Sequence, residues 1–226
     1  MGYFIIAGIF SLIGMVVSNR LRSKFAQYSN VPLANGRSGA QVAEAMLEHY
    51  GVHDVKIVQG QGMLTDHYNP ATKTVSLSPE VYHGRHVAAA AVAAHECGHA
   101  IQHNTAYAWL QFRSAMVPVV SLAARSQQYL LLFALGMFGV TGGTFLVYLT
   151  IAAFGLTTLF SLVTLPVEFD ASNRALAWLE DSNFTRGREH EGAKDALWWA
   201  AMTYVVAALS SLVILLYLMM SLAGRD

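Results

Sequence analysis

The chain has 226 residues, of which 54% are hydrophobic and only 12% are charged, and its formal net charge at pH 7 is zero. This composition argues against an ordinary soluble domain and favours a membrane protein, and the balance of charge gives no support to a nucleic-acid partner. The single cysteine, Cys97, excludes an intrachain disulfide.

The first segment, residues 1–18, is predicted to be an N-terminal transmembrane anchor. No Lys or Arg precedes its apolar run, whereas Arg20, Arg22 and Lys24 follow it. A cleavable signal peptide carries its positive charge before the apolar run. The positive-inside rule therefore predicts an anchor whose N-terminus lies outside and whose C-terminal end lies in the cytosol.

Residues 19–115 are predicted to form a small cytosolic α+β region. A capping box at residues 38–41 opens a helix that stops at Gly51. Residues 55–58 and 74–77 alternate between apolar and polar side chains, with turn formers between them, which predicts two short strands. We expect a small sheet packed beside the next helix.

The most informative motif is the pentapeptide that runs from His95 to His99 and reads H-E-x-x-H. An alanine-rich run precedes it and predicts a helix, on which the two imidazoles face the same way and can reach one Zn²⁺. Glu96 lies about 100° round that helix from His95. It can therefore take a proton from a zinc-activated water without ligating the metal. Cys97 should point away from the metal and pack in the core.

A catalytic zinc ion needs a third protein ligand as well as an open position. His103 continues the four-residue rhythm, but on an unbroken helix it lies about 12 Å along the axis from His95, so it is predicted either to support a ligand without touching the metal or to be structural. Glu168 is the favoured third ligand, with an acid that caps a helix at the membrane interface as the alternative. Asp170 should instead pair with Arg174.

The stretch 129–167 contains no charged residue. As one helix it would run about 58 Å, about twice the thickness of the hydrocarbon core. A transmembrane hairpin over residues 116–165 is therefore predicted, with its turn at 141–144. The hairpin returns Glu168 to the cytosolic side, where Pro166 suits the first turn of a new helix.

After a cytosolic segment at residues 166–201, residues 202–226 are predicted to form a C-terminal transmembrane helix. Every Lys and Arg except Arg225 then lies on the cytosolic side. The predicted fold is a mainly α integral membrane protein with about four transmembrane helices and a small α+β zincin-like cytosolic domain that carries the HExxH helix. The metal chemistry and the charge rule favour this topology independently.

The chain resembles the YugP-type family of bacterial membrane zinc metallopeptidases, which are neutral, gluzincin-like enzymes. The matching segments cover nearly the whole chain in order, at residues 64–70, 75–79, 93–103, 165–172 and 203–204. The resemblance implies a site of His95, His99 and Glu168 with Glu96 as base. More distantly, the chain is similar to membrane proteases that process prenylated or misfolded membrane proteins. These usually carry an aspartate where this chain has Ser172.

Attack on a peptide carbonyl develops negative charge, which needs a stabilising group. His190, His67, Tyr204 and Arg186 are available, and His190 is weakly favoured because it lies in a polar segment that must fold back over the helix bearing Glu168.

The strand at residues 74–77 is the candidate for substrate binding, because it leads directly into the helix of the motif. As an edge strand it could hold an extended peptide by β-augmentation; the alternative is an interior strand of the core. The residues concerned are Thr74, Val75, Ser76 and Leu77.

The predicted function is that of a zinc-dependent endopeptidase, with Zn²⁺ as cofactor, in the inner or plasma membrane of a bacterium, with a multi-pass topology and a cytosolic site. The expected partners are the lipid bilayer and a peptide or membrane-protein substrate. No nucleotide is expected, because no glycine-rich phosphate loop is present. The alternatives are an intramembrane zinc protease and a non-catalytic, zinc-stabilised membrane adaptor or chaperone. No accessory protein is identified.

Overall fold

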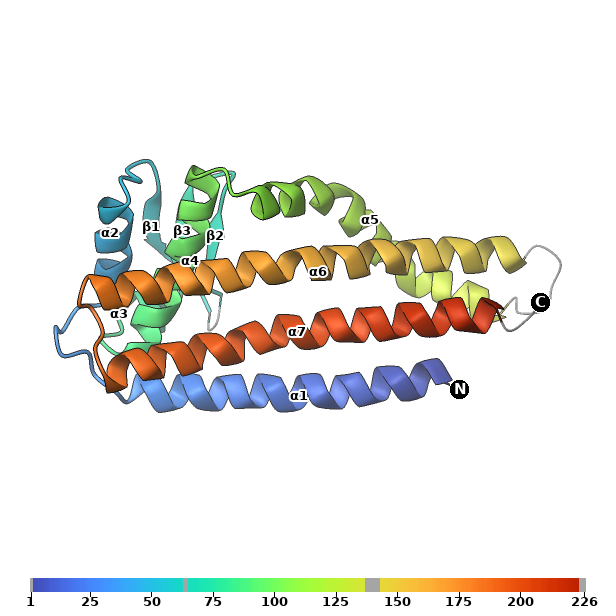
Figure 1. Ribbon diagram of the computed structural model, residues 1–226, viewed down its shortest axis with the longest axis horizontal. Helices are drawn as coiled ribbons and strands as arrows, with labels where there is room; N and C mark the ends of the chain where they lie inside the picture. Colours follow the sequence, from blue (N-terminus) through green and yellow to red (C-terminus); the bar gives the residue numbers. More distant parts are fainter. Residues whose placement is uncertain (1, 63–64, 137–142, 224–226) are drawn as a thin grey trace. The chain divides into compact units, whose positions relative to one another are not determined.

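The computed structural model describes residues 2–62, 65–136 and 143–223, which are mostly helical and include one small sheet (Figure 1). The described elements are, in chain order, α1 (Gly2–Ser29), α2 (Gly39–His49), β1 (Lys56–Gln59), β2 (His67–Asn69), β3 (Thr74–Leu77), α3 (Pro79–His83), α4 (Val87–Asn104), α5 (Ala108–Gly136), α6 (Gly143–Asp181) and α7 (Arg188–Ala223).

The chain divides into two compact units, and helices α1, α5, α6 and α7 contribute residues to both. One unit contains helices only, and we call it the helical unit; it comprises Met1–Val16, Gln111–Leu165 and Thr203–Asp226. The other unit contains the sheet and helices α2, α3 and α4, and we call it the mixed unit; it comprises Val17–Leu110 and Pro166–Met202.

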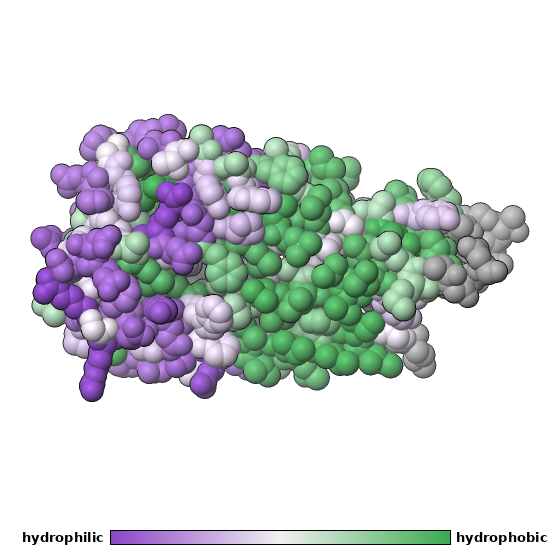
Figure 2. Space-filling model, in the orientation of Figure 1, coloured by the Kyte–Doolittle hydropathy of each residue, from purple (hydrophilic) through white to green (hydrophobic). Residues whose placement is uncertain are grey.

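Within the described residues, α1, α6 and α7 are long and apolar enough to cross a membrane. The first span of the hairpin expected over residues 116–165 falls on α5, which is not among these three helices and contains Pro118. Figure 2 shows apolar residues gathered over the helices of the helical unit, where large side chains such as Leu122, Phe145 and Met220 remain exposed. Exposed apolar surface of this extent is what a lipid-facing region presents.

The uncharged stretch is divided between α5 and α6, as expected. Buried Met116 and Val120 of α5 pack with Val163 of α6, and Leu131 packs with Phe154. The two helices therefore run antiparallel beside each other, as a hairpin requires. The expected turn at residues 141–144 lies largely outside the described residues.

The expectation that a new helix begins at Pro166 is wrong, because α6 is one helix of 39 residues that passes through this proline. Proline has a backbone φ that suits a helix, and it removes one main-chain donor. The packing of the following turns outweighs that loss, since Val167, Ala171 and Ala175 are fully buried in the mixed unit.

The core of the mixed unit forms around α4, whose alanine-rich first half is almost entirely buried. Helix α2 packs along α4, and the capping box predicted at its start is present, with both bonds between Ser38 and Gln41 formed. Small residues set the close spacing. A Cβ atom on Gly39 would lie 2.2 Å from the carbonyl oxygen of Val81 in α3 and 3.2 Å from that of Ala89 in α4.

The sheet has the strand order β1-β3-β2, with β3 parallel to β1 and antiparallel to β2. Both predicted strands are present, but β3 (Thr74–Leu77) is the central one, and its Val75 and Leu77 are fully buried. The expectation that this strand forms an edge is therefore wrong. Strand β2, which was not predicted from the sequence, occupies an edge instead.

Candidate metal centre

Helix α4 presents the two histidines of the motif on one face. The imidazole of His86 caps the start of the helix by accepting the main-chain N–H of Ala89. The rings of His95 and His99 lie one turn apart, with centroids separated by 4.8 Å and planes inclined at 82°. Both side chains are largely buried, so the pair opens only narrowly to solvent.

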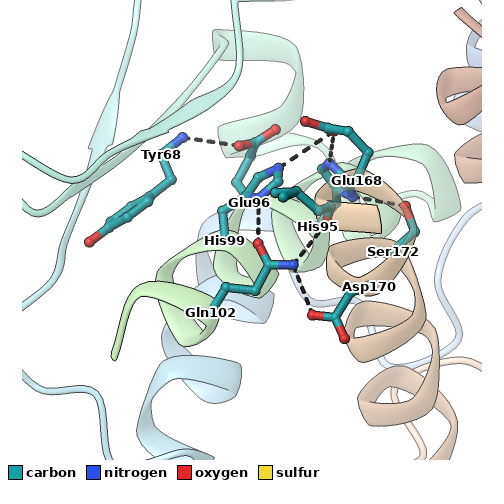
Figure 3. Close-up of polar contacts among 9 residues, drawn as sticks. Tyr68, His95, Glu96, His99, Gln102, Glu168, Asp170 and Ser172 are labelled. Carbon is teal, nitrogen blue, oxygen red and sulfur yellow. Dashed lines mark hydrogen bonds and ion pairs between the residues drawn. The ribbon is translucent and has the colours of Figure 1, made fainter. Parts of the chain in front are cut away.

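Glu168 reaches this pair from α6, because the motif itself provides room for the second helix. A Cβ atom on Gly98 would lie 2.6 Å from the carbonyl oxygen of Ala171, so the two helix backbones approach closely at this point. The Oε2 atom of Glu168 lies 3.5 Å from Nε2 of His95 and 3.6 Å from Nε2 of His99 (Figure 3). One potential ligand atom from each of these three residues lies within 4.8 Å of the others.

The electrostatic environment of this trio favours a cation. Burial alone would lower the pKa of His99, but the contact with the Glu168 carboxylate and the charges of Glu96 and Glu168 outweigh burial, so the pKa of His99 is raised. An environment that raises the pKa of an imidazole above its usual value in water is one that stabilises positive charge. Two imidazole nitrogens and one carboxylate oxygen also form the donor set of many catalytic zinc sites, so the residues fit a Zn²⁺ ion.

Glu96 lies beside the trio rather than within it. Its Oε2 atom accepts the main-chain N–H of Tyr68 at 3.0 Å, which ties strand β2 to helix α4. Figure 3 shows its carboxylate on the same side of α4 as the carboxylate of Glu168. This is the placement that the angular spacing on a helix predicts for a residue next to the metal.

Each histidine of the trio is held at its Nδ1 atom by an uncharged side chain. The hydroxyl of Ser172 lies 3.0 Å from Nδ1 of His95, and Oε1 of Gln102 lies 3.0 Å from Nδ1 of His99 (Figure 3). Neither residue was predicted to have this role. The available signals were spacings, since Gln102 lies three positions after His99 and Ser172 lies four after Glu168.

Three further predictions for this region agree with the structure. Cys97 is buried away from the trio with its thiol towards the carbonyl oxygen of Ala43, and burial raises the pKa of that thiol. His103 contacts the hydroxyl of Tyr68 through Nδ1 at 2.8 Å and is not part of the trio. Asp170 accepts a bond of 2.6 Å from Arg174, as the spacing of four residues predicts.

His190 contacts the last turn of α6 and the connection between α6 and α7. Its Nδ1 atom lies 3.3 Å from the hydroxyl of Thr185, and its Nε2 atom lies 3.6 Å from the carboxylate of Glu180. Both ring nitrogens are thus engaged where α6 connects to α7. These contacts involve no residue of the trio, and the oxyanion-stabilising role of His190 stays a prediction.

The whole chain is similar to known proteins. The family described as "Putative neutral zinc metallopeptidase" matches residues 3–223. The curated protein "Putative membrane protease YugP" of Bacillus subtilis (strain 168) is 43% identical over 208 residues, which cover 92% of this chain and 91% of that protein. No solved structure matches. The family match extends over both units and includes every residue of the candidate centre.

Proposed function

The chain belongs to the family described as "Putative neutral zinc metallopeptidase", and we propose on this premise that it is a membrane-embedded, zinc-dependent endopeptidase. One observation carries the proposal. His95, His99 and Glu168 converge on a space that fits one metal ion, and Glu96 lies beside them. The similarity to a protein named as a membrane protease supports it.

In this proposal His95, His99 and Glu168 hold the zinc ion through Nε2, Nε2 and a carboxylate oxygen. Three protein ligands leave a coordination position open, as catalytic zinc sites require, whereas structural sites are normally closed by four. A zinc ion held there would supply a Lewis acid that polarises the scissile carbonyl and lowers the pKa of the attacking water towards 7.

Glu96 is the general base and then the general acid. It accepts the proton of the attacking water and passes it to the leaving amine. The Tyr68 N–H holds one carboxylate oxygen, Oε2, at 3.0 Å. The other oxygen, Oε1, therefore remains the one that exchanges the proton, and the carboxylate plane is fixed before the substrate arrives.

The substrate is proposed to bind along β2, not along β3, whose two neighbours already pair with it. The N–H of Tyr68 donates to Glu96, so it faces away from β3, towards the side of β2 that pairs with no other strand among the described residues. An extended peptide that adds to this edge by β-augmentation would lie beside the general base.

The proposed topology has four spans, formed by α1, α5, α6 and α7, with the N-terminus outside and the metal centre on the cytosolic side. The distribution of Lys and Arg supports this arrangement, since Arg20, Arg22 and Lys24 follow the first span and only Arg225 follows the last. The antiparallel packing of α5 on α6 agrees with a hairpin.

The test of catalysis compares peptidase activity and zinc content in detergent-purified wild-type, Glu96→Gln and Glu44→Gln proteins. Glu44 is an exposed residue of α2, so its substitution is a matched control. We expect Glu96→Gln to retain zinc and to lose activity by a factor of about 10²–10⁴, while Glu44→Gln behaves like the wild type. Full activity in Glu96→Gln would contradict the role of Glu96, whereas a wild-type protein that binds zinc but has no peptidase activity would favour a non-catalytic zinc-stabilised adaptor.

A further inference from the structure

The side chain of Gln102 is fully buried between α4 and α6, and the mechanism above gives it no role. Its Oε1 atom lies 3.0 Å from Nδ1 of His99. Its Nε2 atom donates to two acceptors on α6, the carbonyl oxygen of Val167 and Oδ2 of Asp170, each at 2.8 Å (Figure 3). A buried amide with all of these contacts formed has a single favourable orientation.

The chemistry of the partners determines that orientation. A main-chain carbonyl and a carboxylate can only accept hydrogen bonds, so the NH₂ group of Gln102 must face Val167 and Asp170. Its carbonyl oxygen then faces His99, and that oxygen also can only accept. The bond between them therefore requires the proton to be on Nδ1 of His99.

We propose that Gln102 is a positioning residue that holds His99 in the tautomer with Nδ1 protonated, so that the Nε2 lone pair faces Glu168 and the metal. Asp170 acts through Gln102, because it fixes the amide and is itself held by Arg174 at 2.6 Å. The inference rests on the proposed function only in so far as His99 is a zinc ligand.

His95 provides the contrast within the same centre. The hydroxyl of Ser172 can donate or accept a hydrogen bond, so its contact with Nδ1 at 3.0 Å is compatible with either tautomer of His95. The two contacts therefore have the same length but differ in what they fix. The contact with Gln102 determines which nitrogen of His99 carries the proton, whereas the contact with Ser172 does not determine this for His95.

The test measures zinc affinity by chelator competition and the visible spectrum of the Co²⁺-loaded protein, both in the full-length chain. The central variant is Gln102→Met, which has a similar size but no hydrogen-bonding groups. The matched control is Gln27→Met, at an exposed position of α1. We expect Gln102→Met to bind zinc about 10–100-fold more weakly and to shift the Co²⁺ bands, whereas Gln27→Met retains both properties.

Asp170→Ala gives a second, milder variant, because the Val167 carbonyl still holds the amide. Its zinc affinity should fall by less than that of Gln102→Met, and adding it to Gln102→Met should cause no further loss. Wild-type zinc affinity and an unchanged Co²⁺ spectrum in Gln102→Met would overturn the inference even if thermal stability falls, and the same result in Asp170→Ala would overturn the part assigned to Asp170. These readouts do not depend on peptidase activity, so they are independent of the Glu96→Gln test.

Discussion

Gly98 has no side chain, and this allows helix α6 to lie close against helix α4. It lies within the metal-binding motif, and its Cα faces the backbone of α6 at Ala171. The distance between the two helices at this point determines whether Glu168 can reach the imidazoles of His95 and His99. A small residue in the motif is therefore a structural condition for Glu168 to serve as the proposed third ligand.

The change Gly98→Ala tests this condition. Because the added Cβ would lie 2.6 Å from the Ala171 carbonyl oxygen, the helices must separate. We expect the free energy of unfolding to fall by about 1–3 kcal/mol and zinc to bind more weakly, as measured by thermal unfolding and chelator competition. Gly155→Ala is the control, since a Cβ atom added there would meet nothing within 4 Å. Equal behaviour of the two variants would show that helix spacing at Gly98 does not matter.

For individual residues, the sequence predicts those contacts that depend only on spacing along one helix. The separation of His95, Glu96 and His99 along one helix is sufficient to place all three, and the pairing of Asp170 with Arg174 follows from the same rule. The contacts of Gln102 and Ser172 were not predicted, because they depend on how α6 lies against α4. No pattern along the chain gives that distance.

Among the elements, strand β2 is the one whose position connects the sheet to Glu96. It is only three residues long, yet it lies at the edge of the sheet and its Tyr68 N–H contacts Glu96. The strand ends at Asn69 and is followed by Pro70. Both residues are turn formers, so a strand was not expected there. Strand β3 was correctly predicted, but its alternating pattern cannot distinguish a central strand from an edge strand.

Tyr68→Pro tests the role of β2 in catalysis. Proline removes the N–H that contacts Glu96, while pairing with β3 is preserved because that N–H faces the free edge. We expect zinc to be retained and kcat/KM to fall by at least about tenfold, as for the loss of one positioning hydrogen bond to a charged group. Tyr68→Phe keeps the N–H and loses only the hydroxyl contact with His103, so it should remain active. A fully active Tyr68→Pro protein would refute this role of the strand.

Helix α6 shows why a local rule can fail in the context of a whole fold. Pro166 is typical of a helix start, and the change from apolar to charged sequence after it suggested a boundary. The helix nevertheless continues, because Val167, Ala171 and Ala175 are buried against the mixed unit's core. Burial of three side chains outweighs one lost main-chain bond.

For the whole molecule, the hairpin of α5 and α6 was predicted by length, since a single helix over the uncharged stretch would be about twice as long as the hydrocarbon core is thick. The structure divides that stretch into two antiparallel helices. The number of spans and their orientation are proposals that depend on the distribution of charge.

Cysteine labelling in right-side-out membrane vesicles tests this topology. In a Cys97→Ala background, Asp226→Cys should react with a membrane-impermeant maleimide in intact vesicles, whereas Arg37→Cys should react only after lysis. Both follow from an outside N-terminus and four spans. If α5 did not cross the membrane, the C-terminus would be cytosolic, and Asp226→Cys would be protected in intact vesicles.

The most direct test of the proposed centre is the zinc content of detergent-purified wild-type, Glu168→Ala and His103→Ala proteins, with Glu96→Gln as a folded control. Glu168 lies within reach of both imidazoles, whereas His103 contacts Tyr68 instead. We predict that Glu168→Ala loses zinc while His103→Ala and Glu96→Gln retain it. Loss of zinc in His103→Ala, with Glu168→Ala still metallated, would contradict both the ligand assignment and the inference that the hairpin returns Glu168 to the catalytic side.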